Sequence, residues 1–170
     1  MAHFAELESK IDPTGFTSDT HKVVVRVTVV GNDIETAAGP LGENDMHVDG
    51  ETWCKDFFNK PDTEFKQTSY NHNFRKQYAG IGMIYDSSKD KFLHSQPHAS
   101  WSLDENDDWK APIPYPTIIN EEGEDWIYEI YWDEDAYNAD NTKGWKAFKS
   151  NDTADPKTIY EWNGTAWVSE

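Results

Sequence analysis

Three pairs of tryptophans in the second half of the chain constrain its fold most strongly. Each pair encloses a cluster of Asp, Asn, Glu or Gly residues, and the pairs are Trp101 with Trp109, Trp132 with Trp145, and Trp162 with Trp167. Large aromatic residues favour strands, whereas the small polar residues between them favour turns. The spacings of 8, 13 and 5 positions exclude a repeat of fixed period. The pattern predicts successive antiparallel hairpins.

Other segments predict further strands. Residues 23–30 are a run of β-branched side chains interrupted once by arginine, and residues 4–7 are their expected antiparallel partner. We expect another strand at residues 65–70, and a hairpin formed by residues 81–86 and 91–94. The polar stretches between these segments, chiefly residues 8–21, 33–49 and 71–80, are expected to be loops.

A single short helix is expected at residues 49–59. Acidic residues begin this segment, Trp53 and Phe57 lie four positions apart, and Pro61 follows it. Side chains four apart share one face of a helix, and proline cannot continue one.

Residues 111–117 read Ala-Pro-Ile-Pro-Tyr-Pro-Thr. Proline fixes φ and removes a backbone donor, so alternating prolines predict an extended strap. The predicted fold class is therefore all-β or β-rich, with successive antiparallel hairpins, one short helix and this proline-rich strap. We expect an N-terminal β unit with the helix at residues 1–96 and a Trp-hairpin unit at residues 97–170, with one continuous sheet as the alternative.

The composition predicts a folded protein with a thin aliphatic core. Leu, Ile, Val and Phe total 30 of 170 residues and the formal net charge is −17, a combination that favours disorder. Against it stand 8 Trp, 8 Tyr and 8 Phe, each able to bury roughly 150–250 Å². The acidity repels phosphate, so nucleic acid is not an expected partner.

The sequence predicts a soluble protein made in a cytoplasm. Its first residues lack the basic and apolar regions of a secretory signal. The longest apolar run, at residues 23–30, is too short to cross a bilayer, so no membrane is expected as a partner. A single cysteine, Cys54, excludes an internal disulfide and reads as a small buried side chain.

No motif indicates catalysis, a cofactor or a metal. Adjacent carboxylates occur in turn-like segments, where the burial that tunes a catalytic carboxyl is not expected. Residues 104–108 are rich in oxygen ligands but lack the ligand spacing of an EF-hand. His94 and His98 are separated by Pro97, which excludes a regular helix that would place both on one face. The expectation is a non-enzymatic binding or assembly module.

The candidate interaction surface has three parts. They are a pair of adjacent basic residues that lies among aromatic residues, the proline-rich strap, and three tryptophans. Two roles stay open for Arg75 and Lys76, namely contact with a ligand and ion pairing inside the fold. Three stay open for the tryptophans, namely core, protein interface and glycan stacking. The candidate residues are Arg75, Lys76, Tyr78, Trp101, Trp109, Pro112, Pro114, Tyr115 and Trp132.

Several blocks of this chain, taken in order, resemble one known family. They are residues 1–7, 67–71, 75–82, 100–117 and the closing Tyr-x-Trp hairpin that ends in Trp167-Val. The chain resembles a family of small, mostly uncharacterised virion structural proteins of tailed cyanophages and other marine phages. Residues 9–21 and 121–156 depart from that pattern as a lengthened turn and an insertion. The resemblance implies a virion component and supplies no catalytic residues.

The resulting hypothesis is an accessory structural protein of a tailed phage particle that decorates the head. Its expected partners are the major capsid or tail proteins, or further copies of itself. One alternative is a tail or fibre component that binds host surface glycans through Trp hairpins. Another is an acidic, host-directed protein that masks a basic target.

Overall fold

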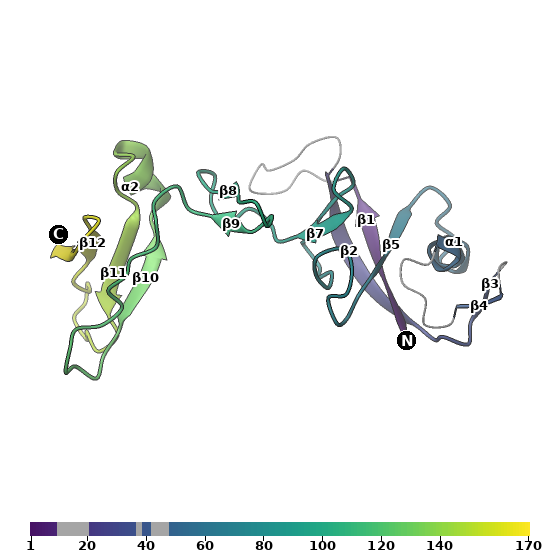
Figure 1. Cartoon of the computed structure of the whole chain (residues 1–170), viewed down its shortest axis with the longest axis horizontal. Helices are drawn as coiled ribbons and strands as arrows, with labels where there is room; N and C mark the ends of the chain where they lie inside the picture. The colour runs from purple at the N-terminus through teal and green to yellow at the C-terminus, as the bar shows by residue number, and fades with distance from the viewer. Residues whose placement is uncertain (10–20, 37–38, 42–47) are drawn as a thin grey trace. The chain divides into compact units, whose positions relative to one another are not determined.

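The computed structural model describes residues 1–9, 21–36, 39–41 and 48–170 (Figure 1). The chain divides into two compact units. The first contains Met1–Pro97 and Glu105–Asp108, and the second contains His98–Asp104 and Trp109–Glu170. The boundary expected from the sequence lies after residue 96, and the two divisions differ at Pro97 and at residues 105–108, which belong to the first unit. Residues 10–20 of the predicted loop 8–21, and residues 37–38 and 42–47 of the predicted loop 33–49, lie outside the described residues. The described part of the loop predicted at 33–49 also contains two short strands and the start of a helix.

The first unit is built on a five-stranded antiparallel sheet. The strand order is β5-β1-β2-β6-β7. The strands are β1 (Ala2–Glu8), β2 (His21–Val30), β5 (Glu64–Thr68), β6 (Ile84–Asp86) and β7 (Lys91–Leu93). β1 pairs with β2 as the sequence predicts, and β6 and β7 form the predicted hairpin. Two short strands, β3 (Glu35–Thr36) and β4 (Gly39–Pro40), pair with each other.

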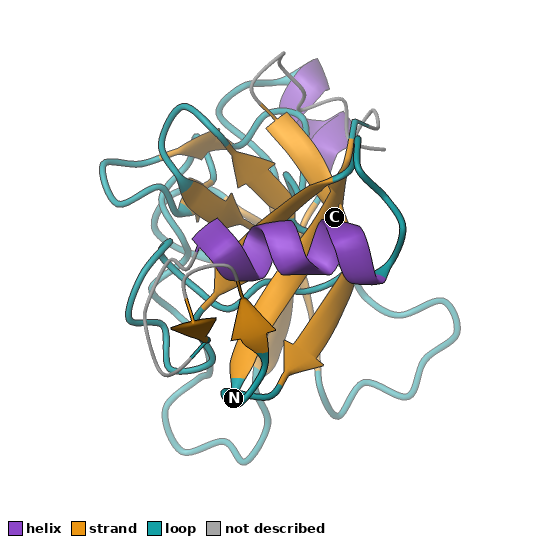
Figure 2. Cartoon of the chain, turned by 90° about the vertical axis from the view of Figure 1, so that its right-hand side faces the viewer, coloured by secondary structure: helices purple, strands orange, loops and turns teal. Residues whose placement is uncertain are grey.

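Successive side chains of β1 point to opposite faces of this sheet, so β1 contributes to a separate hydrophobic cluster on each face. On one face Phe4 packs with Leu41, Phe65 and Cys54 of helix α1 (Val48–Phe57). Figure 2 shows α1 lying across the strands. On the other face Ala5 and Leu7 pack in a separate cluster, completed by Val24, Ala79, Met83, Tyr85 and Phe92. Cys54 is buried, as predicted.

The second unit contains a four-stranded antiparallel sheet in the order β10-β11-β12-β13, preceded by a small hairpin. The elements are β8 (Ser102–Leu103), β9 (Trp109–Lys110), β10 (Tyr128–Trp132), β11 (Trp145–Lys149), β12 (Tyr160–Trp162) and β13 (Trp167–Ser169). Trp132 is paired directly with Trp145, and Trp162 with Trp167. The predicted Trp-bracketed hairpins are therefore confirmed, as is the β-rich fold class.

A second helix, α2 (Glu134–Ala139), was not predicted. It occupies the connection between β10 and β11, where the sequence Asp-Glu-Asp was interpreted as part of a turn. Asp133 caps its N-terminus by accepting a hydrogen bond from the Ala136 amide at 3.0 Å. Neither helix in the described part of the chain has the length and apolar character needed to cross a membrane.

Candidate functional site

One loop of the first unit carries three predicted contact residues, Arg75, Lys76 and Tyr78. It connects β5 to β6 and includes the segment that was predicted to be a loop. The φ angles of His72, Arg75 and Lys76 are +57, +53 and +68°. This left-handed conformation costs a residue with a side chain about 1–2 kcal/mol. Contacts with the rest of the unit must therefore hold the loop in place.

Hydrogen bonds of Arg75 provide those contacts. Its Nε donates to Asp90 Oδ1 at 2.7 Å, and its Nη1 donates to Glu51 Oε1 at 3.0 Å and to the Gln67 carbonyl at 2.8 Å. The Arg75 carbonyl accepts from the Phe92 amide at 3.1 Å. Only 7% of the Arg75 side chain is exposed. Of the two roles that the sequence left open, the structure places Arg75 in the internal one.

Lys76 is also held within the first unit. Its Nζ donates to the Asn106 carbonyl and to Asp108 Oδ1, both at 2.6 Å. The side chains of Arg75 and Lys76 thus anchor the loop by their charges. The exposed residues of this loop include one tyrosine, Tyr70, together with polar residues such as Asn71 and Asn73.

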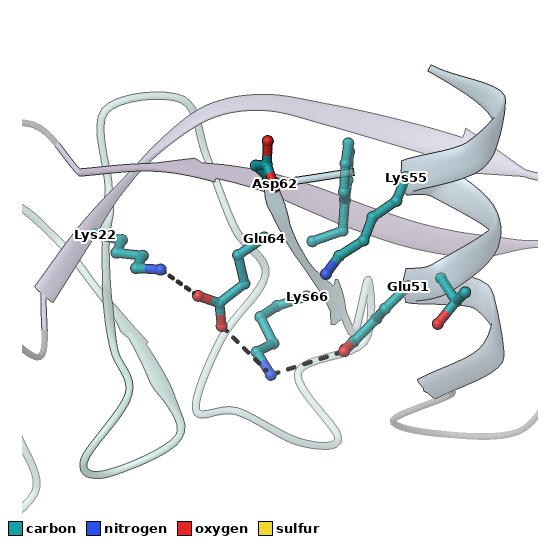
Figure 3. A pocket seen from close by; sticks show the side chains of 8 residues that line it. Lys22, Glu51, Lys55, Asp62, Glu64 and Lys66 are labelled. Carbon is teal, nitrogen blue, oxygen red and sulfur yellow. Dashed lines mark hydrogen bonds and ion pairs between the residues drawn. The ribbon is translucent and has the colours of Figure 1, made fainter. Parts of the chain in front are cut away.

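The Arg75 network continues into a charged pocket, shown in Figure 3. Lys66 Nζ lies 3.7 Å from a carboxylate oxygen of Glu51 and 3.5 Å from one of Glu64. The other carboxylate oxygen of Glu64 lies 2.5 Å from Lys22 Nζ. Positive and negative groups therefore alternate along the pocket, which encloses about 380 Å³. Its lining residues are Lys22, Glu51, Thr52, Lys55, Asp62, Glu64, Phe65 and Lys66.

The ionisation of this pocket does not resemble that of an acid–base site. Burial disfavours the charged form of Glu64, but contacts with Lys22 and Lys66 outweigh it and lower its pKa. A general acid at neutral pH needs the opposite shift. Among the described residues there is also no cluster of three side chains suited to a metal ion. The prediction that the protein is not an enzyme stays a prediction.

An aromatic triad is formed by the exposed Tyr70 and the half-buried Tyr78 of the Arg75 loop with the half-buried His3 of β1. His3 and Tyr70 stack with ring centres 5.8 Å apart, and the edge of Tyr78 meets both rings at 5.4 and 5.6 Å. Tyr70 is 68% exposed. Burial, and then the neighbouring N-terminus, lowers the pKa of His3 and so favours the neutral form of its ring. The triad therefore offers an uncharged, polarisable surface to a partner.

The described backbone around the triad is well supported. The Tyr78 amide donates to His72 Nδ1 at 3.1 Å, and the next amide, Ala79 N, donates to Thr68 Oγ1 at 2.7 Å. Pairing of His3 with Thr68 in the sheet brings β1 and β5 together beneath the rings. An aromatic group held by such contacts can dock a partner through its exposed ring with little loss of conformational entropy.

In the second unit the predicted contact residues divide between core and surface. Trp132 is 6% exposed and packs against Trp145 and Trp101 at 5.1 and 6.2 Å. Its ring is buried in the core and cannot form part of a contact surface. The prediction that Trp132 is a contact residue is therefore wrong. Trp101 and Trp109 are half-buried, whereas Pro112, Pro114 and Tyr115 are exposed.

The strap at residues 111–117 closes the tryptophan cluster. The Trp145 indole N–H donates to the carbonyl of Ile113 within the strap at 3.0 Å, and that of Trp167 donates at 2.7 Å to the carbonyl of Ile118, the residue that follows the strap. Tyr115 lies edge-on to Trp145 at 4.9 Å. Prolines cannot donate backbone hydrogen bonds, but the strap carbonyls still accept them. For Trp145 and Trp132, the core role is the one that the structure supports.

The sequence interpretation missed two surface features. His3 and Tyr70 are brought together by the β1–β5 pairing, which the sequence did not predict. Phe57 is exposed although its helix was predicted, because only the Cys54 side of α1 faces the sheet. The signal available for Phe57 was the i, i+4 pair with Trp53, which was used to predict the helix and not its outward face.

No known family model matches this chain, and no curated protein or solved structure resembles it significantly.

Proposed function

We propose that this protein is a non-enzymatic accessory structural component of a tailed phage particle, located on the head surface. The observation that carries the docking part of this proposal is the His3–Tyr70–Tyr78 triad, in which the exposed Tyr70 and the half-buried Tyr78 lie on the loop anchored by the buried Arg75 and the half-buried His3 lies on β1. Aromatic residues are over-represented among those that dominate protein interfaces. The virion part rests on the block-by-block sequence resemblance.

The charge distribution supports an outward location on a particle that contains DNA. The first unit has 18 acidic and 10 basic residues, and the second has 14 and 5. Both units are therefore strongly acidic and repel a phosphate backbone. Several carboxylates of the first unit, including Glu6, Glu51 and Glu64, are paired with lysine or arginine within the unit.

The test is quantitative mass spectrometry on gradient-purified particles of the phage that encodes the chain, comparing full virions with tail-less heads. Hundreds of copies retained on heads are expected. A few copies lost with the tail would instead favour the tail or fibre alternative. Complete absence from particles would contradict both and leave the acidic masking protein.

A matched pair of variants tests the triad as the docking surface. Tyr70→Ala should reduce the number of copies bound to heads at least tenfold, because it removes the most exposed ring. Tyr131→Ala, an exposed tyrosine of the second unit, is the control and should bind normally. Equal occupancy by both variants would show that docking uses another surface.

One observation supports the alternative of a tail or fibre component that binds host glycans. The nearly parallel His3 and Tyr70 rings, tilted by 23°, form a flat face of the kind that stacks on sugars. Its original form, in which tryptophans line the contact face, loses support because Trp132 and Trp162 are buried. Titration with saccharides should then perturb the NMR signals of Tyr70 rather than tryptophan fluorescence.

A further inference from the structure

Helix α1 leaves one aromatic side chain, Phe57, largely exposed. Phe57 is 65% exposed at the end of the helix and stacks on Trp53 at 4.7 Å with the rings 16° from parallel. Its edge meets Phe58 at 5.0 Å, and Phe58 in turn stacks on the buried Phe65 at 5.9 Å. A continuous aromatic ridge therefore runs from the surface into the core.

A second pocket, of about 220 Å³, adjoins this ridge at Trp53. Its lining contains three carboxylates and no basic side chain, and comprises Glu35, Thr36, Asp49, Thr52, Trp53 and Asp56. Within the described ranges, none of the three carboxylates takes part in an ion pair, unlike Glu51 on the same helix. The pocket therefore places three carboxylates that have no ion pair with a described residue beside an indole ring.

The position of Asp56 works against the stability of its own helix. Asp56 lies in the last turn of α1, where the helix dipole favours a positive charge. Asp49 lies in the first turn, where the dipole favours a carboxylate, so its place is explained by the helix alone. Asp56 lacks such a local explanation. Residues that break local rules without compensation often serve binding.

The same ridge already holds one guanidinium group. The Cζ atom of Arg26 lies 3.8 Å from the centre of the Phe58 ring, and its Nη2 lies 2.5 Å from Glu6 Oε2. An arginine between an aromatic face and a carboxylate is thus compatible with this part of the fold. Trp is a better cation–π partner than Phe, and arginine is the cation found there most often.

We propose that the second pocket and the Trp53–Phe57 stack form a docking site for an arginine-bearing segment of a partner protein. The guanidinium binds among Glu35, Asp49 and Asp56, and an adjacent apolar side chain of the partner covers Phe57. Charge complementarity selects a basic partner, and the exposed ring selects one with an apolar neighbour beside the arginine. The site requires neither a virion location nor the His3–Tyr70–Tyr78 triad, so each proposal can fail alone.

The probe is a capped Gly-Arg-Leu-Gly peptide, titrated into the ¹⁵N-labelled full chain and followed by NMR. The indole N–H signal of Trp53, assigned with a Trp53→Phe variant, should shift and saturate. The matched Gly-Gln-Leu-Gly peptide should bind at least tenfold more weakly. A peptide with glutamine that binds equally, or an unmoved Trp53 signal, would overturn the proposal.

A charge-matched pair of variants separates this site from the general attraction of cations to an acidic protein. Asp49→Asn with Asp56→Asn should weaken binding at least tenfold. Asp62→Asn with Glu129→Gln removes the same charge elsewhere and should leave binding within about twofold. Equal losses in both would overturn the site. The single variant Asp56→Asn separates loss of binding from misfolding. It removes an unfavourable interaction with the helix dipole, so it should not destabilise the helix, and it should still weaken binding.

Discussion

Gly144 occupies the position at which the Trp132 ring meets the backbone of the second sheet. A Cβ atom there would lie 2.5 Å from the ring, and the φ angle of Gly144 is +142°. The Asp133 amide donates to the Gly144 carbonyl at 2.8 Å, which fixes this backbone next to Trp132. Glycine is required here both by space and by conformation.

Gly144→Ala should lower the free energy of unfolding of the second unit by about 2–4 kcal/mol, combining backbone strain with overpacking against Trp132. Urea unfolding followed by tryptophan fluorescence measures the change. Gly164→Ala is the control, since Gly164 has a φ of +96° but no neighbouring atom within 4 Å of an added Cβ. It should cost only the strain, about 1 kcal/mol. Equal losses would mean that Trp132 moves aside freely.

Tyr128 provides a residue-scale prediction about alkaline pH. Burial, followed by the hydrogen bond that its hydroxyl donates to Glu121 at 2.9 Å, raises the pKa of Tyr128 to about 12. An unfolded tyrosine titrates near pH 10. The folded state therefore holds the proton more tightly, and its stabilising effect is complete below pH 10 and is lost between pH 10 and 12.

Tyr128→Phe should consequently flatten part of the decline in the free energy of unfolding between pH 10 and 12. Urea unfolding at half-unit pH intervals measures the slope. Tyr115→Phe, which alters an exposed ring, serves as the control and should leave the slope unchanged. A slope for Tyr128→Phe that matches the unaltered protein would refute the assignment.

At the scale of elements, the strap depends on indole hydrogen bonds for its attachment. Trp167→Phe removes the donor to the Ile118 carbonyl and should cost about 1–3 kcal/mol. It should also increase proteolytic cleavage within residues 111–119, because this end of the strap loses its anchor. Trp162→Phe alters a tryptophan of the same cluster for which the structure gives no bond to the strap. If cleavage of the strap rises equally in both variants, general loosening of the core is the cause.

The elements predictable from the sequence are those with a strong local pattern. The β-branched run of β2 and the Trp–turn–Trp segments needed no information from distant residues. Helix α2 was missed because none of its six residues is buried, so it shows no apolar period. Its one usable signal was Asp133 followed by Glu134 and Asp135, which fits an N-cap and acidic first turn.

The candidate site was less predictable than the fold. Arg75 could be identified as a basic residue among aromatics, but its partners Glu51 and Asp90 are 24 and 15 positions away. Sequence periodicity carries no information about such pairs. The outward face of α1 was likewise hidden, because an i, i+4 aromatic pair looks the same on the buried and the exposed side of a helix.

At the scale of the whole molecule, lowering the pH has two opposite effects on the free energy of unfolding. It weakens the ion pairs, and it relieves the repulsion that comes from a net charge of −17. Burial raises the pKa of Asp90, but its bonds with Tyr85 and Arg75 outweigh this and lower it. Hydrogen bonds from Lys89 and Lys91 lower the pKa of Asp107 to about 2. Carboxyls with lowered pKa values stabilise the folded state above their unfolded pKa near 4, and this stabilisation is lost as the pH falls through the lowered values.

Acidification also relieves repulsion among the unpaired carboxylates, which would stabilise the fold. That repulsion acts over distances comparable with the Debye length, about 8 Å at 0.15 M salt, and is largely screened. The ion pairs act at contact, as in the 2.7 Å bond between Arg75 and Asp90, and are screened much less. The loss of pairs should therefore dominate, and the free energy of unfolding should fall between pH 5 and pH 2.

Urea unfolding at 0.15 M salt, repeated at pH 7, 5, 4, 3 and 2, tests this balance. Asp107→Asn should reduce the stability at pH 7 and flatten the fall below pH 4, because it removes the carboxyl with the most strongly lowered pKa. Asp62→Asn removes a carboxylate that has no ion pair in the described structure and should leave the fall unchanged. Stability that instead rises as the pH approaches 3 would mean that repulsion among the 32 acidic residues outweighs their pairing.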